Sequence, residues 1–255
     1  MKTVYQCSNT VTGIFSAIYD GWKERRDEEW GIKIKEDGEL ELFSTYVEVE
    51  ENNRKVLAVE SMIKRHLGYA AYWDIYHAAL SFDYSKGNAI AETILEARKL
   101  KDSKKIMEHL SNPSVLKVFA LSRNVGGEAH NLTGFVRFKE LQSQILYGEI
   151  TPKNQVLTCL APHFADRLPV ENWMIYDKSH HMLVVHEAKK QWVLVSDEEL
   201  KIEKTLQFSE KEEEFSRMWQ GFCKSISIAS RENRRCQMNH LPLRYRGNMT
   251  EFVLS

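Results

Sequence analysis

The apolar residues of this chain recur at two spacings, which predict helices in some segments and strands in others. In residues 11–22 they stand three and four apart, the period of a helix with one apolar face. From about residue 53 to 110 the same spacing predicts three or four helices, with a break at residues 85–88. Short apolar or alternating runs predict strands at residues 2–6, 32–35 and 44–50.

Beyond residue 112 the pattern predicts three more helices and five more strands. Asn112 caps free N–H groups and Pro113 fits the first helical position, so a helix is expected from there to about Gly126-Gly127 or slightly beyond. Further helices are expected over residues 153–168, bent at Pro162, and over about 208–228. Strands are expected as a hairpin at 135–141 and 145–150, and as an antiparallel meander at 172–177, 181–187 and 191–196.

Helices and strands thus fall in separate groups and do not alternate. This grouping indicates an α+β fold that is mostly helical and has small antiparallel sheets. The break at residues 85–88 predicts two parts, an N-terminal α+β portion over residues 1–84 and a C-terminal α+β domain over residues 85–255.

Composition and charge exclude several classes of protein. The 255 residues are 43% hydrophobic and 28% charged, as in ordinary globular proteins, and the net charge of −1 argues against a protein that is basic throughout. No apolar run approaches the roughly 20 residues of a membrane span, so no membrane partner is expected. The four Cys are widely spaced, which predicts neither a disulfide framework nor a zinc knuckle, and a reduced, cytoplasmic location is expected.

Sequence motifs for common cofactors and nucleophiles are absent. The chain has no phosphate-binding P-loop, no Gly-x-Gly-x-x-Gly after a strand, no His-Glu-x-x-His and no Gly-x-Ser-x-Gly. His180 and His186 share a strand face but would lie about 20 Å apart, too far for one ion. His181 points the other way. No metal site and no cofactor are therefore expected.

The segment EAHNLTGFVRF, residues 128–138, carries the first candidate chemistry. Glu128 and His130 are a candidate acid/base pair, since a carboxylate can orient a histidine. Residues two apart do not face each other on a helix, so the pair requires that the helix has already ended. A structural polar cluster at a helix–strand junction and a ligand contact are the alternatives. Arg123 is a candidate partner for Glu128, and Arg137 lies in the expected strand, on the face opposite Val136. Both, together with Arg167, are candidate nucleic-acid-binding residues.

Two further segments carry candidate ligand-binding residues. His163 and Arg167 follow Pro162 on one helical surface, which either binds an anion or is simply a solvated face. Residues 231–246 hold five Arg and one Glu, a local charge of +4. Arginines interleaved with an aromatic residue are typical of phosphate contact and base stacking, and the candidates are Arg234, Arg235, Arg244 and Tyr245. The alternative is pairing of these arginines with residues 212–214, which are three Glu.

Taken together, several stretches resemble a bacterial family of DNA metabolism or DNA repair proteins whose shared portion is a domain of unknown function. They are VYQCSNTVTGIFSAIYDGW, RNVGGEAHNLTGFVRF, LAPHFADRL with NWMIYDK, and RENRRCQMNHLPLRYR. The resemblance implies a setting in DNA repair, with a radical-SAM protein or a uracil-DNA-glycosylase-type protein as partner. The family's motif residues fall on Arg123, Glu128, His130, Gly134, Phe135, Arg137, Phe138, Pro162, His163, Phe164, Arg167, Trp173, Pro242, Arg244 and Tyr245.

Three functions follow as hypotheses. The first is a DNA-binding accessory protein of bacterial repair, with no cofactor of its own. The second is an enzyme acting on nucleic acid, hydrolase- or glycosylase-like, with Glu128, His130 and His163 as acid/base groups. The third is a protein scaffold that does not bind DNA. The matching motif segments also predict that EAHNLTGFVRF packs near APHFADRL, and that helix 115–125, strand 135–141 and helix 153–168 then share one core.

Overall fold

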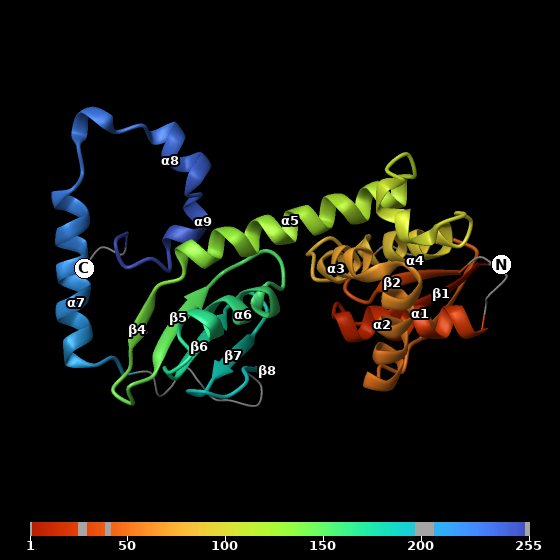
Figure 1. Ribbon diagram of the computed structural model, residues 1–255, viewed down its shortest axis with the longest axis horizontal. Coiled ribbons are helices and arrows are strands. Elements are labelled where there is room, and N and C mark those ends of the chain that lie inside the picture. The colour runs from red at the N-terminus through yellow and green to blue at the C-terminus, as the bar shows by residue number, and fades with distance from the viewer. Residues whose placement is uncertain (1, 25–29, 39–41, 197–206, 253–255) are drawn as a thin grey trace. The chain divides into compact units, whose positions relative to one another are not determined.

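The computed structural model describes residues 2–24, 30–38, 42–196 and 207–252 (Figure 1). Contacts divide the chain into two compact units, Met1–Gly126 (unit 1) and Gly127–Ser255 (unit 2). The division falls inside the helix α5 (Pro113–Phe135). The boundary predicted between residues 84 and 85 lies within unit 1. None of the helices in the described ranges has the length and apolar character needed to cross a bilayer.

Unit 1 contains a three-stranded parallel sheet of order β2-β1-β3. Its first elements are β1 (Lys2–Cys7), α1 (Val11–Glu24), β2 (Trp30–Ile34) and β3 (Ser44–Glu48). The strands were expected at these places, but the antiparallel pairing predicted for the small sheets is wrong here. The reason lies in α1, because a helix between two neighbouring strands returns the chain to the same end of the sheet.

After β3, three α-helices and a 3₁₀ helix precede α5 in the described part of unit 1. They are α2 (Asn53–His66), α3 (Gly68–Ala79), α4 (Lys86–Ala97) and the 3₁₀ helix η1 (Ser103–Glu108). The Asn52 side chain accepts from the first N–H groups of α2 and caps it. Their apolar faces join the sheet and α1 in one core, in which Ile63, Ile75 and Ile90 are fully buried. The predicted break at residues 85–88 is in fact the start of α4.

Helix α5 continues well past the glycine pair at which it was expected to end. Gly126 and Gly127 lie inside it, although glycine costs a helix about 1 kcal/mol relative to alanine. The helical spacing of buried residues continues through Val125, Ala129 and Leu132, and this burial offsets the cost. The strand predicted from residue 135 therefore begins only at Phe138.

Unit 2 is built on a five-stranded sheet of order β4-β5-β6-β7-β8. Its strands are β4 (Phe138–Glu140), β5 (Leu146–Ile150), β6 (Trp173–Asp177), β7 (Met182–His186) and β8 (Val193–Ser196). The predicted hairpin β4-β5 and meander β6-β7-β8 are confirmed as antiparallel. The strands β5 and β6 are parallel, because α6 (Leu157–Arg167) connects them. The sheet is thus mixed, and the α+β class holds.

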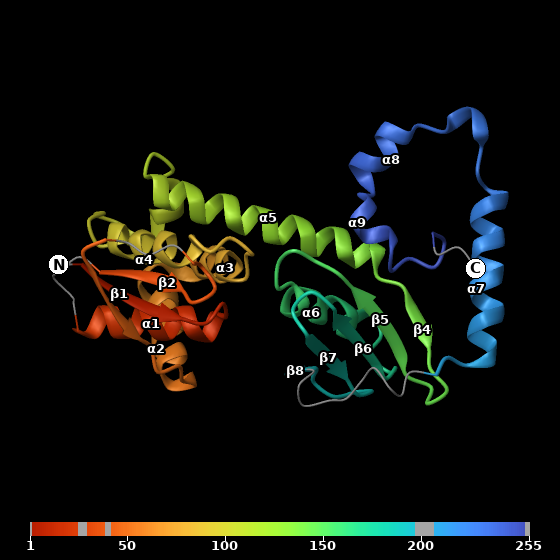
Figure 2. The same cartoon turned by 180° about the vertical axis from the view of Figure 1, so that it is seen from behind.

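The remaining elements of unit 2 follow the sheet in the chain (Figures 1 and 2). They are α7 (Glu210–Ser225), the short 3₁₀ helix η4 (Ala229–Arg231), α8 (Arg234–His240) and α9 (Leu243–Arg246). Helix α7 has no buried residue, and polar contacts attach it to the rest of the unit. The Glu212 carboxylate accepts from Glu140 N of β4, and Gln220 Nε2 donates to Thr250 O. Its largest apolar side chains therefore stay at the surface.

The two motif segments pack together, as predicted. Phe138 of EAHNLTGFVRF and Phe164 of APHFADRL meet edge to face, with ring centroids 5.2 Å apart, and both contact Trp173. The expected common core with residues 115–125 is wrong. Val115 and Val118, at the start of α5, belong to the core of unit 1.

Candidate functional site

Glu128 is the centre of a buried polar network in unit 2. Its side chain accepts hydrogen bonds from the backbone N–H groups of Lys153 and Asn154, at 3.1 and 2.8 Å, and from Asn154 Nδ2 at 2.6 Å. Tyr245 Oη donates to it at 3.3 Å, and Arg244 Nη2 lies 3.2 Å from its Oε1. The network joins α5, the segment after β5, and α9. It fills the carboxylate's hydrogen-bonding capacity and leaves no room for a substrate.

Arg244 and Tyr245 are part of this network. Tyr245 is 2% exposed, its ring packs on Phe135 with centroids 5.3 Å apart, and the Arg244 guanidinium lies over the ring, 4.6 Å from its centroid. Burial raises the pKa of Tyr245, so its hydroxyl stays protonated and donates to Glu128. A base could stack on this ring only after α9 had left it. The two residues fix the C-terminal segment in place.

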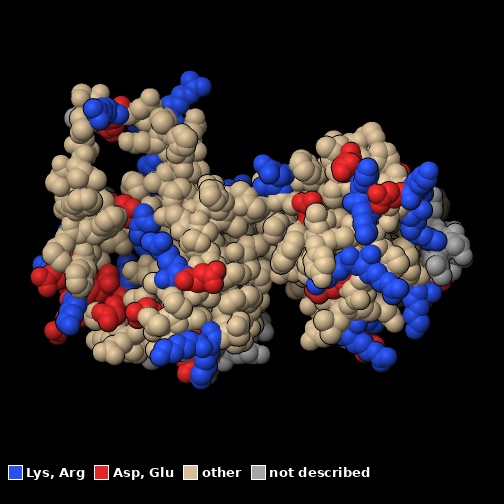
Figure 3. Space-filling model, in the orientation of Figure 1, with Lys and Arg blue, Asp and Glu red and all other residues tan. Residues whose placement is uncertain are grey.

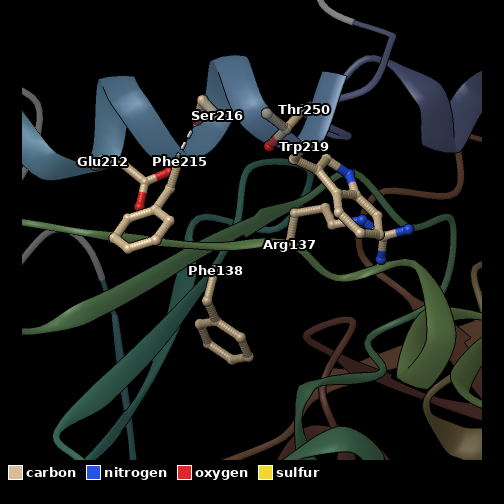
Figure 4. Close-up of a pocket in the computed structure, with 7 residues that line it drawn as sticks. All are labelled: Arg137, Phe138, Glu212, Phe215, Ser216, Trp219 and Thr250. Atoms are coloured by element: carbon tan, nitrogen blue, oxygen red, sulfur yellow. Dashed lines mark hydrogen bonds between the residues drawn. The ribbon is translucent and has the colours of Figure 1, made fainter. Parts of the chain in front are cut away.

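A groove beside this network contains Arg137. It has a volume of about 430 Å³ and is lined by Arg137, Phe138, Glu212, Phe215, Ser216, Trp219 and Thr250 (Figure 4). Arg137 precedes β4 and forms a bidentate ion pair with Glu251, with 2.7 Å between Nη2 and Oε1. It also donates to the Gly134 and Val136 carbonyls. The groove therefore combines a fixed guanidinium with aromatic walls.

The apolar face of α7 extends the aromatic surface of this groove. Phe215, Trp219 and Phe222 are 58%, 41% and 52% exposed, and the last two rings stack at 5.8 Å. Met218 and Ile226 flank them. On the face of α7 that Figure 3 shows, no charged side chain appears in the upper part, acidic residues gather at the lower end, and basic residues appear where α8 begins. The acidic end holds Glu210, Glu213 and Glu214, all exposed.

The arginines after α7 are exposed. Arg231 ends η4, and Arg234 and Arg235 begin α8, whose Asn233 cap accepts from Cys236 N. The alternative in which these arginines pair with the glutamates of residues 212–214 gains no support. Within the described residues Glu212 instead accepts from Glu140 N and Ser216 Oγ. Three guanidinium groups thus face solvent at the end of the aromatic face of α7.

The predicted acid/base group is not assembled. Glu128 and His130 both lie inside α5, where residues two apart do not face each other, and Glu128 is buried while His130 is exposed. His163 is exposed on α6 and contacts the Phe164 ring. In the described ranges no contact joins His130 to Glu128 or to His163. The condition under which the pair was predicted, a helix that ends before residue 128, is not met.

The other candidates lie at the surface. Arg123 belongs to unit 1 and Arg167 to α6 of unit 2, and both are exposed. The predicted pair of Arg123 with Glu128 does not form, because Glu128 faces the interior of unit 2.

No group of three or more metal-ligating side chains occurs among the residues described. Of the strand histidines, His186 is buried against Trp173, and His180 Nδ1 lies 2.6 Å from the Asp177 carboxylate.

Sequence reasoning missed the residues that shape the groove around Arg137. Glu251 and Thr250 come from the last residues described, and Trp219 was assigned only to the apolar face of a helix. The sequence hints at a role for Glu251 only weakly, because it is a single carboxylate that follows the basic segment 231–246. Nothing in the sequence places it beside a residue 114 positions earlier.

Comparison with known families gives one match. A model described as a domain of unknown function, DUF4130, covers residues 84–251. The chain belongs to this family. The matched region includes α4, all of α5, the sheet of unit 2 and the groove of Arg137, whereas β1 to α3 precede it. No curated protein matches the chain.

Proposed function

We propose that this DUF4130 protein is a DNA-binding accessory protein of bacterial DNA repair or metabolism, acting with a radical-SAM or glycosylase-type partner. DNA reaches it through unit 2, along α7 and α8. The repair setting and the partner come from the resemblance of the motif segments to DNA repair proteins. The DNA contact has its own support in the surface of unit 2.

One observation carries the proposal: an exposed row of aromatic rings ends at three exposed arginines. Rings at the surface offer stacking to unpaired bases at about 1–3 kcal/mol per base, and arginines bind the phosphates between them. The rings are Phe215, Trp219 and Phe222, and the cations are Arg231, Arg234 and Arg235. The combination favours single-stranded DNA, because the bases of a duplex are not free to stack. The cluster of carboxylates at the start of α7 repels phosphate and directs the strand toward α8.

The rival enzyme hypothesis has less support. Its carboxylate, Glu128, is enclosed by five hydrogen-bonding groups, and its two histidines are exposed, with no hydrogen bond to either ring within the described residues. A general acid or base must reach the substrate, which Glu128 cannot do in this arrangement.

A salt titration tests the DNA contact. Each phosphate neutralised on a single strand contributes about −0.7 to the slope of log K against log salt. Replacing Arg231, Arg234 and Arg235 together by alanine is therefore expected to flatten the slope by about 2.1. The measurement is binding of a fluorescent single-stranded oligonucleotide to the full chain over a range of salt concentrations.

The matched control replaces the same three residues by lysine, which keeps the charge, so its slope should equal that of the parent. Equal slopes for the parent and the alanine variant would remove the arginines from the binding surface. If the parent fails to bind at ~50 mM salt, where phosphate contacts are strong, the proposed function is wrong.

A further inference from the structure

Arg137 and Trp219 together hold a carboxylate group. The Arg137 guanidinium approaches Glu251 side-on, with Nη2 2.7 Å from Oε1 and Nε 3.2 Å from Oε2. The indole Nε1 of Trp219 donates to the same Oε2 at 3.2 Å. A guanidinium in this bidentate arrangement binds the oxygens of a phosphate as well as those of a carboxylate. The donors around Glu251 thus form a site for an oxyanion.

The surroundings of these donors fit a nucleotide. Figure 4 shows Arg137 and Trp219 side by side at one end of the groove and Phe215 at the other, while the Phe138 ring points away from α7. The groove volume of about 430 Å³ is large enough to admit a base next to a phosphate. Ser216 and Thr250 add polar groups to its wall. A phosphate at Arg137 would place the neighbouring base against an aromatic ring.

We propose that Arg137 and the Trp219 indole form the binding site for one backbone phosphate of single-stranded DNA, and that Glu251 occupies it as an internal competitor. The inference rests on the proposed function and adds to it a defined phosphate position. It also implies a state of the protein in which Glu251 fills the phosphate site, so that no DNA phosphate binds there. The site is separate from the arginines of α8.

Glu251 can leave the site by rotation of its side chain alone. The backbone on its N-terminal side is anchored, since Met249 is buried and the Thr250 carbonyl accepts from Gln220. Burial raises the pKa of Glu251, but hydrogen bonds from Arg137 and Trp219 outweigh it, and the pKa lies below its usual range. The side chain is therefore an anion at neutral pH. It competes directly with a phosphate for the same guanidinium.

The test is the Glu251→Gln variant of the full chain, titrated with a single-stranded oligonucleotide. Glutamine keeps the size of the side chain and removes its charge, so the guanidinium becomes available to phosphate. Glu251 and a phosphate compete for the same guanidinium. Removing the Glu251 charge is therefore expected to raise the affinity for the oligonucleotide about fivefold or more. One added phosphate contact should also steepen the salt slope by about 0.7.

Two controls separate this effect from a change in overall charge. Glu171→Gln removes the same charge from an exposed position between α6 and β6, and it should give neither the gain nor the steeper slope. In the double variant Arg137→Gln, Glu251→Gln the gain should disappear. If the Glu251→Gln chain melts at a lower temperature than the parent, Glu251→Asp replaces it, because the shorter side chain loosens the pair without removing the charge.

The outcomes distinguish the inference from the proposed function. Equal binding by the parent, Glu251→Gln and Glu251→Asp overturns the inference and leaves the proposed function standing. A gain that survives in the double variant also overturns the inference. A gain in affinity for Glu251→Gln that is lost in the double variant supports the inference. If no variant binds DNA, both proposals are wrong.

Discussion

Replacing Glu128 by alanine is expected to lower the free energy of unfolding of unit 2 by about 3–5 kcal/mol. The change removes the carboxylate that accepts from the Lys153 and Asn154 N–H groups and from the Tyr245 hydroxyl, and it leaves the Arg244 guanidinium beside an empty space. Loss of one partner from a buried ionic network has a cost of this size. Denaturant unfolding of the variant and the parent, followed by a spectroscopic signal of unit 2, measures it.

Glu214→Ala is the matched control for this experiment. Glu214 is an exposed carboxylate on α7, and its removal should change the free energy of unfolding by less than about 0.5 kcal/mol. A loss below about 1 kcal/mol for Glu128→Ala would mean that the buried network contributes little to the stability of unit 2.

Replacing Lys86 by methionine is expected to stabilise unit 1 at pH 7 by about 2 kcal/mol. Lys86 is fully buried at the start of α4, and its Nζ donates to the Ser81 carbonyl. Burial lowers the pKa of Lys86 to about 8 from a usual value of 10.5. That difference corresponds to about 3 kcal/mol, from which the lost hydrogen bond subtracts about 1 kcal/mol. Methionine has a similar volume and no charge to desolvate.

The advantage of the methionine variant should disappear at high pH. Between pH 8 and 10.5 the unfolded chain still binds the lysine proton while the folded chain has released it, so the parent gains stability as the pH rises. Burial raises the pKa of the Cys7 thiol to about 12, which opposes this gain above pH 9. The variant contains the same thiol, so most of this opposing effect is shared by the two proteins and cancels in their difference.

Unfolding experiments at pH 7 and pH 10 give this difference. Lys104→Met serves as the control, because Lys104 is exposed and its replacement should have the same small effect at both pH values. A constant difference between the parent and Lys86→Met at the two pH values would show that the Lys86 pKa is not lowered.

The strand and helix positions could be predicted more completely than the pairing of the strands. Residues 145–150 and 172–177 were both expected as strands, and both are. Their parallel pairing depends on the path of residues 151–172, which carry α6 to one face of the sheet. Periodicity describes which side of an element is apolar, and it contains no information about the direction in which the next strand returns.

The candidate site illustrates a second limit of sequence reasoning. Glu128, Arg244 and Tyr245 were all selected, but they were assigned to catalysis and DNA contact, and they instead hold one another in the interior of unit 2. A glycine pair normally ends a helix, which favoured an exposed Glu128. Only the burial of the following turns of α5 reverses that expectation, and burial depends on residues distant in the sequence.

The hydrogen bond between Glu128 and Tyr245 spans 117 residues of sequence, which affects how the protein can be made. While the chain is being synthesised, the Glu128 carboxylate has no access to Tyr245 or Arg244 until α9 has left the ribosome. At about 5–20 residues per second, this interval lasts on the order of ten seconds. During it the α5–β5 region exposes a carboxylate and the face of Phe135. A nascent chain stalled before residue 243 therefore presents a recognisable unfinished surface to chaperones and proteases.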